Sequence, residues 1–70
     1  MEDSTRKDIR RILKTFGIGA DEALVAHLAR NPDIITLRVK LTLEDMTDYG
    51  DLEPPQPLHL VVEDEIIREN

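Results

Sequence analysis

The sequence contains no cysteine and no tryptophan, and Phe16 and Tyr49 are its only aromatic residues. Without cysteine, neither a disulfide nor a thiolate metal site can stabilise the chain. Seventy residues amount to one small domain, which buries only about 60% of the surface exposed by its unfolded chain. We therefore expect a single, marginally stable domain over residues 1–70, with little room for a catalytic pocket.

Long apolar runs are also absent, so we expect no transmembrane or secretory segment and a cytoplasmic location. The net charge of −6 disfavours a general nucleic-acid binder. This charge is unevenly spread along the chain. Residues 1–32 carry six basic and five acidic side chains, whereas residues 33–70 carry three and ten. A nearly neutral first half is thus joined to a strongly acidic second half.

A first helix is predicted over residues 5–16, where the apolar residues recur with the helical period. They fall at positions i, i+3, i+4 and i+7: Ile9, Ile12, Leu13 and Phe16. Ser4 or Thr5 is the expected N-cap, and Gly17 is the expected C-terminal stop.

A second helix is predicted over residues 20–30. Gly19 is its expected N-cap, and Leu24 and Leu28 lie on one face. The Asn31-Pro32 pair ends it, because proline disfavours helical conformation in the preceding residue. The two helices would form a hairpin or corner through the glycine-containing turn at residues 17–19.

Beyond Pro32 the apolar period changes from 3.6 to 2, which predicts two strands. The apolar positions of the first strand are Ile35, Leu37, Val39, Leu41 and Leu43, and those of the second begin with Leu58, Leu60 and Val62. An antiparallel register with Leu43 opposite Leu58 places Arg38 opposite Glu63. A slip of two residues places Lys40 opposite Glu63 instead, so the pattern fixes the parity and leaves the register open.

These elements predict an α+β fold of two layers, with two N-terminal helices packed on one face of a small antiparallel hairpin sheet (ααββ). Residues 45–56, rich in acidic residues and proline, form the inter-strand loop, and residues 1–4 and 68–70 are expected to fray. A two-stranded sheet leaves both edges open, so a homodimer through a strand edge is expected.

One segment of the predicted first helix and its end, residues 9–18, carries a family resemblance. Its Leu13-Lys14-Thr15-Phe16-Gly17-Ile18 run resembles short bacterial proteins of unknown function whose N-terminal helix ends in a leucine-lysine-threonine-aliphatic-glycine-aliphatic run. The chain departs from them at Gly19-Ala20, where those proteins tend to have polar helix-capping residues. The resemblance implies a small stand-alone bacterial protein. It supplies no activity, cofactor or catalytic residue.

Five acidic residues lie within ten positions of the inter-strand loop: Glu44, Asp45, Asp48, Asp51 and Glu53. Carboxylates in a turning loop bind Ca²⁺, but this loop lacks the EF-hand pattern. Counted from Asp45, that motif requires Asp or Asn at the third and fifth positions and Glu at the twelfth, where this chain has Thr47, Tyr49 and Gln56. We expect a solvated acidic loop with no metal or cofactor, and keep divalent-cation binding as an alternative.

A second alternative is a weak nucleic-acid contact through the basic first helix. In a helix-turn-helix arrangement the second helix would lead into the groove with Asp21 and Glu22, which phosphates repel. We therefore do not expect nucleic acid as a partner. The isolated His27 and His59 and the single serine, Ser4, assemble no catalytic constellation, and we expect no enzymatic activity.

The leading hypothesis is a non-enzymatic protein–protein interaction or regulatory module, which binds a protein partner through a strand edge or through charged faces. The expected partner contacts are the basic residues of the first helix and the acidic residues of the loop: Arg6, Arg10, Arg11, Lys14, Asp45, Asp48, Asp51 and Glu53.

Overall fold

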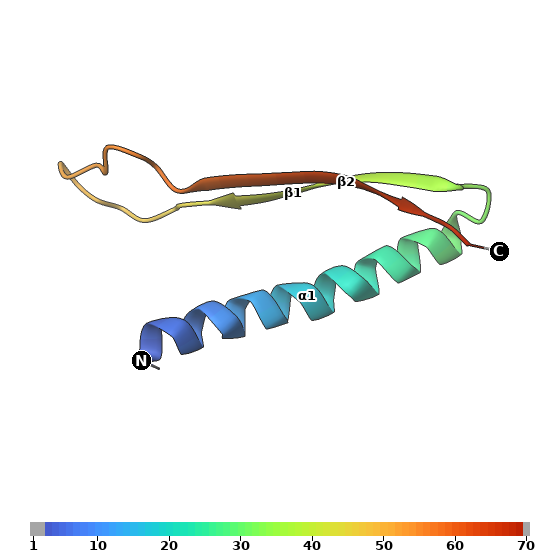
Figure 1. Ribbon diagram of the computed structural model, residues 1–70, viewed down its shortest axis with the longest axis horizontal. Coiled ribbons are helices and arrows are strands. Elements are labelled where there is room, and N and C mark those ends of the chain that lie inside the picture. The colour runs from blue at the N-terminus through green and yellow to red at the C-terminus, as the bar shows by residue number, and fades with distance from the viewer. Residues whose placement is uncertain (1–2, 70) are drawn as a thin grey trace. The chain divides into compact units, whose positions relative to one another are not determined.

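A computed structural model describes residues 3–69, which contain one helix and two strands (Figure 1). These are α1 (Ser4–Arg30), β1 (Thr36–Glu44) and β2 (His59–Ile67). The chain divides into two compact units, Met1–Ile34 and Ile35–Asn70, which are described separately. An α+β composition is confirmed. The expectation of two helices packed on the sheet is wrong, because residues 3–69 contain a single helix.

The helix α1 continues through the segment where a turn was expected, and Figure 1 draws it as one uninterrupted coil. Gly17 and Gly19 are both helical, at a cost of about 1 kcal/mol each relative to alanine. Stopping and restarting the helix would instead leave several N–H and C=O groups without intrahelical partners. The apolar spacing also stays in phase, because Ile9, Phe16 and Ala23 follow one another at seven-residue intervals.

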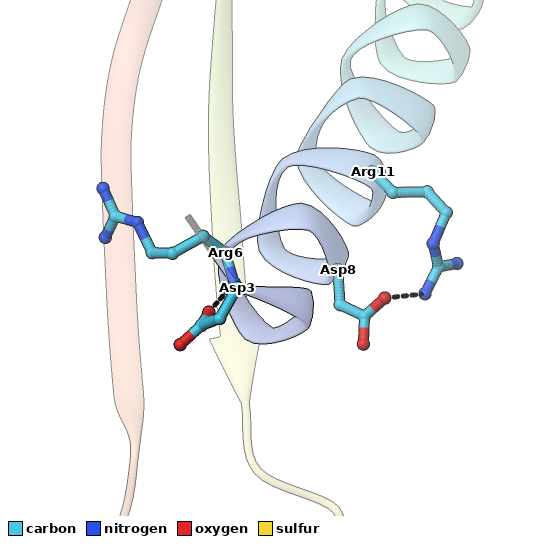
Figure 2. A network of polar contacts seen from close by, with 4 residues as sticks. All are labelled: Asp3, Arg6, Asp8 and Arg11. Carbon is cyan, nitrogen blue, oxygen red and sulfur yellow. Dashed lines mark hydrogen bonds and ion pairs between the residues drawn. The ribbon is translucent and has the colours of Figure 1, made fainter. Parts of the chain in front are cut away.

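The N-terminus of α1 is capped by Asp3, one residue before the expected caps. Its Oδ1 accepts a hydrogen bond of 3.0 Å from the backbone N–H of Arg6 (Figure 2). This bond satisfies one of the helix's unpaired donors. Ser4 and Thr5, the predicted caps, are therefore the first helical residues.

The C-terminus of α1 is at Arg30, as predicted. Asn31 caps it twice: its backbone N–H donates to the carbonyl of Leu28 at 3.2 Å, and its Nδ2 donates to the carbonyl of His27 at 2.8 Å. Pro32 follows and has no N–H with which to continue the helix.

The strands β1 and β2 pair antiparallel without interruption from Thr36↔Ile67 to Glu44↔His59. Leu43 pairs with Leu60, so the expected pairing with Leu58 is wrong and the register slipped by two residues is the one observed. The observed register places Arg38 opposite Glu65 and Lys40 opposite Glu63, which gives two opposite-charge pairs where the expected register gives one.

Cross-strand partners share a face, so the register divides the hairpin into two surfaces. One surface, called here the hairpin apolar face, consists of Leu37, Val39, Leu41, Leu43, Leu60, Val62 and Ile66. Asp64, opposite Val39, is the one charged residue among them. The other surface carries the two charge pairs.

No residue between 3 and 69 is buried. On the hairpin apolar face, Leu60 is 55% exposed and Val62 is 47% exposed. A two-stranded hairpin is marginal by itself in water. The hairpin by itself therefore offers no second layer that could bury its apolar side chains.

The single domain predicted over residues 1–70 stays a prediction. The expected fraying at the ends falls partly on Met1, Glu2 and Asn70, which lie outside the described residues. Near the C-terminus, the backbone N–H of Arg68 donates a hydrogen bond to the carbonyl of Ile35 at 2.8 Å. This bond extends the pairing of β1 and β2 beyond the Thr36↔Ile67 pair.

The continuity of α1 predicts the effect of alanine at its glycines. A Cβ at Gly17 or Gly19 meets no atom within 4 Å, so each alanine variant should gain helicity and about 1 kcal/mol of helix stability. Thermal unfolding followed by circular dichroism measures both effects. Gly50→Ala is the matched control and should destabilise, because Gly50 has φ +64°. A loss of helicity in Gly17→Ala would instead indicate a left-handed turn at residue 17.

Candidate functional site

The predicted basic contacts lie along the N-terminal half of α1. Arg6, Arg10 and Lys14 follow at four-residue spacing, which places them along one side of the helix. Arg11 lies one turn before Lys14, and its Nη2 is 3.3 Å from Oδ1 of Asp8, an ion pair whose side chains are both exposed (Figure 2). Such exposed pairs contribute at most about 0.5 kcal/mol. The basic patch is therefore a solvated helix face with no enclosed binding geometry.

The predicted acidic contacts lie in the loop between β1 and β2, where two of them form local turns. Asp45 accepts hydrogen bonds from the backbone N–H of Thr47, at 2.9 Å, and from the hydroxyl of Tyr49. Asp48 accepts from the backbone N–H of Gly50, at 2.9 Å. These carboxylates shape the loop by binding its own donors.

The acidic residues of this loop are spread along the described chain and are not gathered into one cluster. Across residues 3–69, no three histidine, aspartate or glutamate side chains lie close enough together to hold a metal ion. Asp51 and Glu53 are therefore close to Asp45 and Asp48 in the sequence, but they do not form a cluster of metal ligands with them in the described structure. The cation-binding alternative finds no site in the described part of the chain.

The hydrogen bond between Tyr49 and Asp45 shifts the pKa of both side chains. The pKa of Asp45 lies below its ordinary value of 3.8, chiefly because the Tyr49 hydroxyl donates to the carboxylate and secondly because the Thr47 N–H does. The pKa of Tyr49 lies above 10.0, because its proton is held by Asp45. The pair therefore stabilises the loop at neutral pH. It weakens as pH falls through the lowered pKa of Asp45, or rises through the raised pKa of Tyr49.

The hairpin apolar face is a surface that the predicted charged contacts do not include. It presents seven apolar side chains on two adjacent strands, and Leu41 and Leu43 are 37% and 44% exposed. Contiguous exposed apolar surface is typical of interaction sites in proteins. The alternation of apolar and polar residues in the sequence already indicated this surface, because two strands with one apolar face require a covering layer.

The reverse face of the hairpin is polar and carries exposed charge pairs. Arg38 Nε lies 3.9 Å from Glu65 Oε1, and the two side chains are 84% and 53% exposed. Lys40 faces Glu63 in the adjacent row. These pairs favour the observed register and contribute little energy otherwise.

The Asp45–Tyr49 hydrogen bond is tested by Tyr49→Phe. Removing the hydroxyl should raise the pKa of Asp45 toward 3.8, because the larger of its two stabilising hydrogen bonds is lost. An NMR titration of the side-chain carboxyl carbon measures this change. An unmoved Asp45 titration in the variant would show that the tyrosine does not hold the carboxylate.

No helix among residues 3–69 combines the length and the apolar character needed to cross a membrane; α1 has the length but carries charged residues throughout. Comparison with protein-family models, with curated proteins and with solved structures found no match to this chain. Its exposed surfaces are therefore the guide to its function.

Proposed function

We propose that this chain is a protein–protein interaction module whose main contact surface is the hairpin apolar face. The observation that carries the proposal is the exposure of this face: Leu60, Val62 and Leu43 are each between 44% and 55% exposed. A protein partner that covers them would supply the second layer that a two-stranded sheet lacks.

The size of this face limits what it contributes alone. Complete burial of a leucine or valine is worth about 1.5–3 kcal/mol, so the four exposed side chains of this face, which are 37–55% exposed (Leu41, Leu43, Leu60 and Val62), supply roughly 4 kcal/mol. Association itself costs about 4–15 kcal/mol. Apolar contact by itself would therefore give weak binding. The open strand edges offer the missing contribution, because an added strand contributes main-chain hydrogen bonds.

The charged residues have a secondary part in this proposal. Arg6, Arg10, Arg11 and Lys14 on α1, and the acidic loop, form the polar surroundings that steer encounter and exclude wrong partners. No feature of the described residues favours nucleic acid over protein for the basic patch. We therefore retain protein as the partner class.

The proposal also carries forward two expectations from the sequence. The chain acts without catalysis, as a binding protein. It works in the cytoplasm. Thiols are kept reduced there and disulfides rarely form, so a protein without cysteine loses no source of stability.

A pair of adjacent residues on β2 tests the proposed contact surface. Leu60 lies on the hairpin apolar face, and its neighbour Val61 lies on the reverse face. A photoreactive amino acid at position 60, introduced in the native cell, should cross-link one discrete partner protein. The same probe at position 61 should not cross-link that partner, because alternate residues of a strand point to opposite faces.

A substitution at the same positions provides the quantitative control. Leu60→Arg should weaken binding of the identified partner at least tenfold, whereas Val61→Arg should leave it within about twofold, because only the first buries a charge in the contact. Equal losses in both variants, or cross-linking from position 61 alone, would contradict the assignment of the surface.

A further inference from the structure

The outer edge of β1 is an open hydrogen-bonding surface. β1 belongs to a sheet of two strands and is paired on one side only, with β2. Beyond that ladder, no backbone hydrogen bond of the described chain involves a residue between 36 and 44. Nine consecutive residues therefore present unpaired N–H and C=O groups at alternate positions, which is a template for another strand.

The outer edge of β2 is protected against the same kind of pairing. Glu63, Asp64 and Glu65 occupy its middle, and Asp64 lies on the hairpin apolar face opposite Val39. A charge directed toward the apolar side is a known means of blocking edge-to-edge association. The longest antiparallel self-pairing sets like charges opposite each other in both strands, Glu63 in β2 and Lys40 in β1, so the inward Asp64 is the feature that distinguishes the two edges.

The sequence of β1, by contrast, is complementary to itself. When two copies of β1 pair, residues opposite each other share a face of the sheet. Apolar residues therefore lie opposite apolar residues only if the two paired residue numbers add to an even number. The register centred on Lys40 sets two lysines opposite each other, and the one centred on Val39 sets Arg38 opposite Lys40. The register centred on Leu41 is the longest without like charges opposite each other.

We propose that β1 pairs antiparallel with β1 of a second copy of this chain about Leu41, which makes a four-stranded sheet in the order β2–β1–β1–β2. Arg38 then lies opposite the partner's Glu44, Lys40 opposite the partner's Thr42, and Val39 opposite the partner's Leu43. The inference rests on the proposed function, since it names a second copy as one protein that the module binds.

Two consequences of this register support it. A row of side chains across the polar face of the four strands runs from Glu65 to Arg38, then to the partner's Glu44 and the partner's His59. Arg38 therefore lies between two carboxylates, that of Glu65 and that of the partner's Glu44. On the other side, the two hairpin apolar faces become one continuous surface on four strands, large enough to require a covering layer. The interaction uses the same edge on both copies and leaves only the protected β2 edges outside, so that assembly stops at two chains.

Cysteine cross-linking tests the register directly, because the natural chain contains no cysteine. In Leu41→Cys the two copies of residue 41 lie opposite each other, within about 5.5 Å between Cα atoms, which a disulfide spans. In Val62→Cys, the matched control on the same cross-strand pair, the two copies are separated by three strand spacings, or about 14 Å. Mild oxidation of the purified protein should therefore give a covalent dimer for Leu41→Cys alone.

Charge reversal tests the proposed pairs in a second way. Glu44→Arg sets two arginines opposite each other, and Arg38→Glu sets two glutamates opposite each other. Each variant alone should raise the dimer dissociation constant about tenfold, because two attractive pairs become repulsive. An equimolar mixture of the two variants should restore wild-type affinity, since both pairs in the mixed dimer are again opposite in charge. Sedimentation velocity over a wide concentration range measures the affinity.

The outcomes separate this inference from the broader proposal. A chain that stays at about 8 kDa at every concentration overturns the dimer, while a partner cross-linked from Leu60 would still support the interaction module. A dimer that cross-links through Val62→Cys and not through Leu41→Cys overturns the assigned edge. Failure of the mixed variants to recover affinity overturns the register.

Discussion

The alternation of apolar and polar residues in β1 and β2 is the constraint on which the rest of the hairpin depends. Partners across the ladder share a face, so Leu41 and Val62 collect with their neighbours on one side and the charges on the other. Two strands supply an apolar face but no opposing layer of their own, and no residue of the described chain is buried. The apolar content that a larger domain would use for a core is here a surface.

Charge in this molecule selects among arrangements that the apolar pattern alone allows. Within the hairpin, Arg38 and Lys40 favour the register in which each faces a carboxylate. On the edges, Asp64 opposes association through β2, and the proposed pairing of Arg38 with the partner's Glu44 favours it through β1. These exposed pairs add little energy, but each distinguishes one register from its neighbours.

The sequence predicted the strands well because their signal is local. Alternation placed β1 within one residue of its observed bounds and fixed which residues share a face. It did not determine the register, because Glu63 and Glu65 have the same parity and either can face Arg38. The helix was divided wrongly at Gly17, where a C-terminal stop and a tolerated interior glycine look alike in sequence. The apolar contact surface was missed because it was assigned to a core under two helices.

The central claim is that this chain is stabilised by association with a second copy, and the concentration dependence of its thermal unfolding tests that claim most directly. A folded dimer that unfolds to separate chains gains about 1.4 kcal/mol for each tenfold rise in protein concentration. The account predicts that the Tm of the hairpin signal rises by several degrees over each such step. A Tm that stays constant over a hundredfold range of concentration would contradict it.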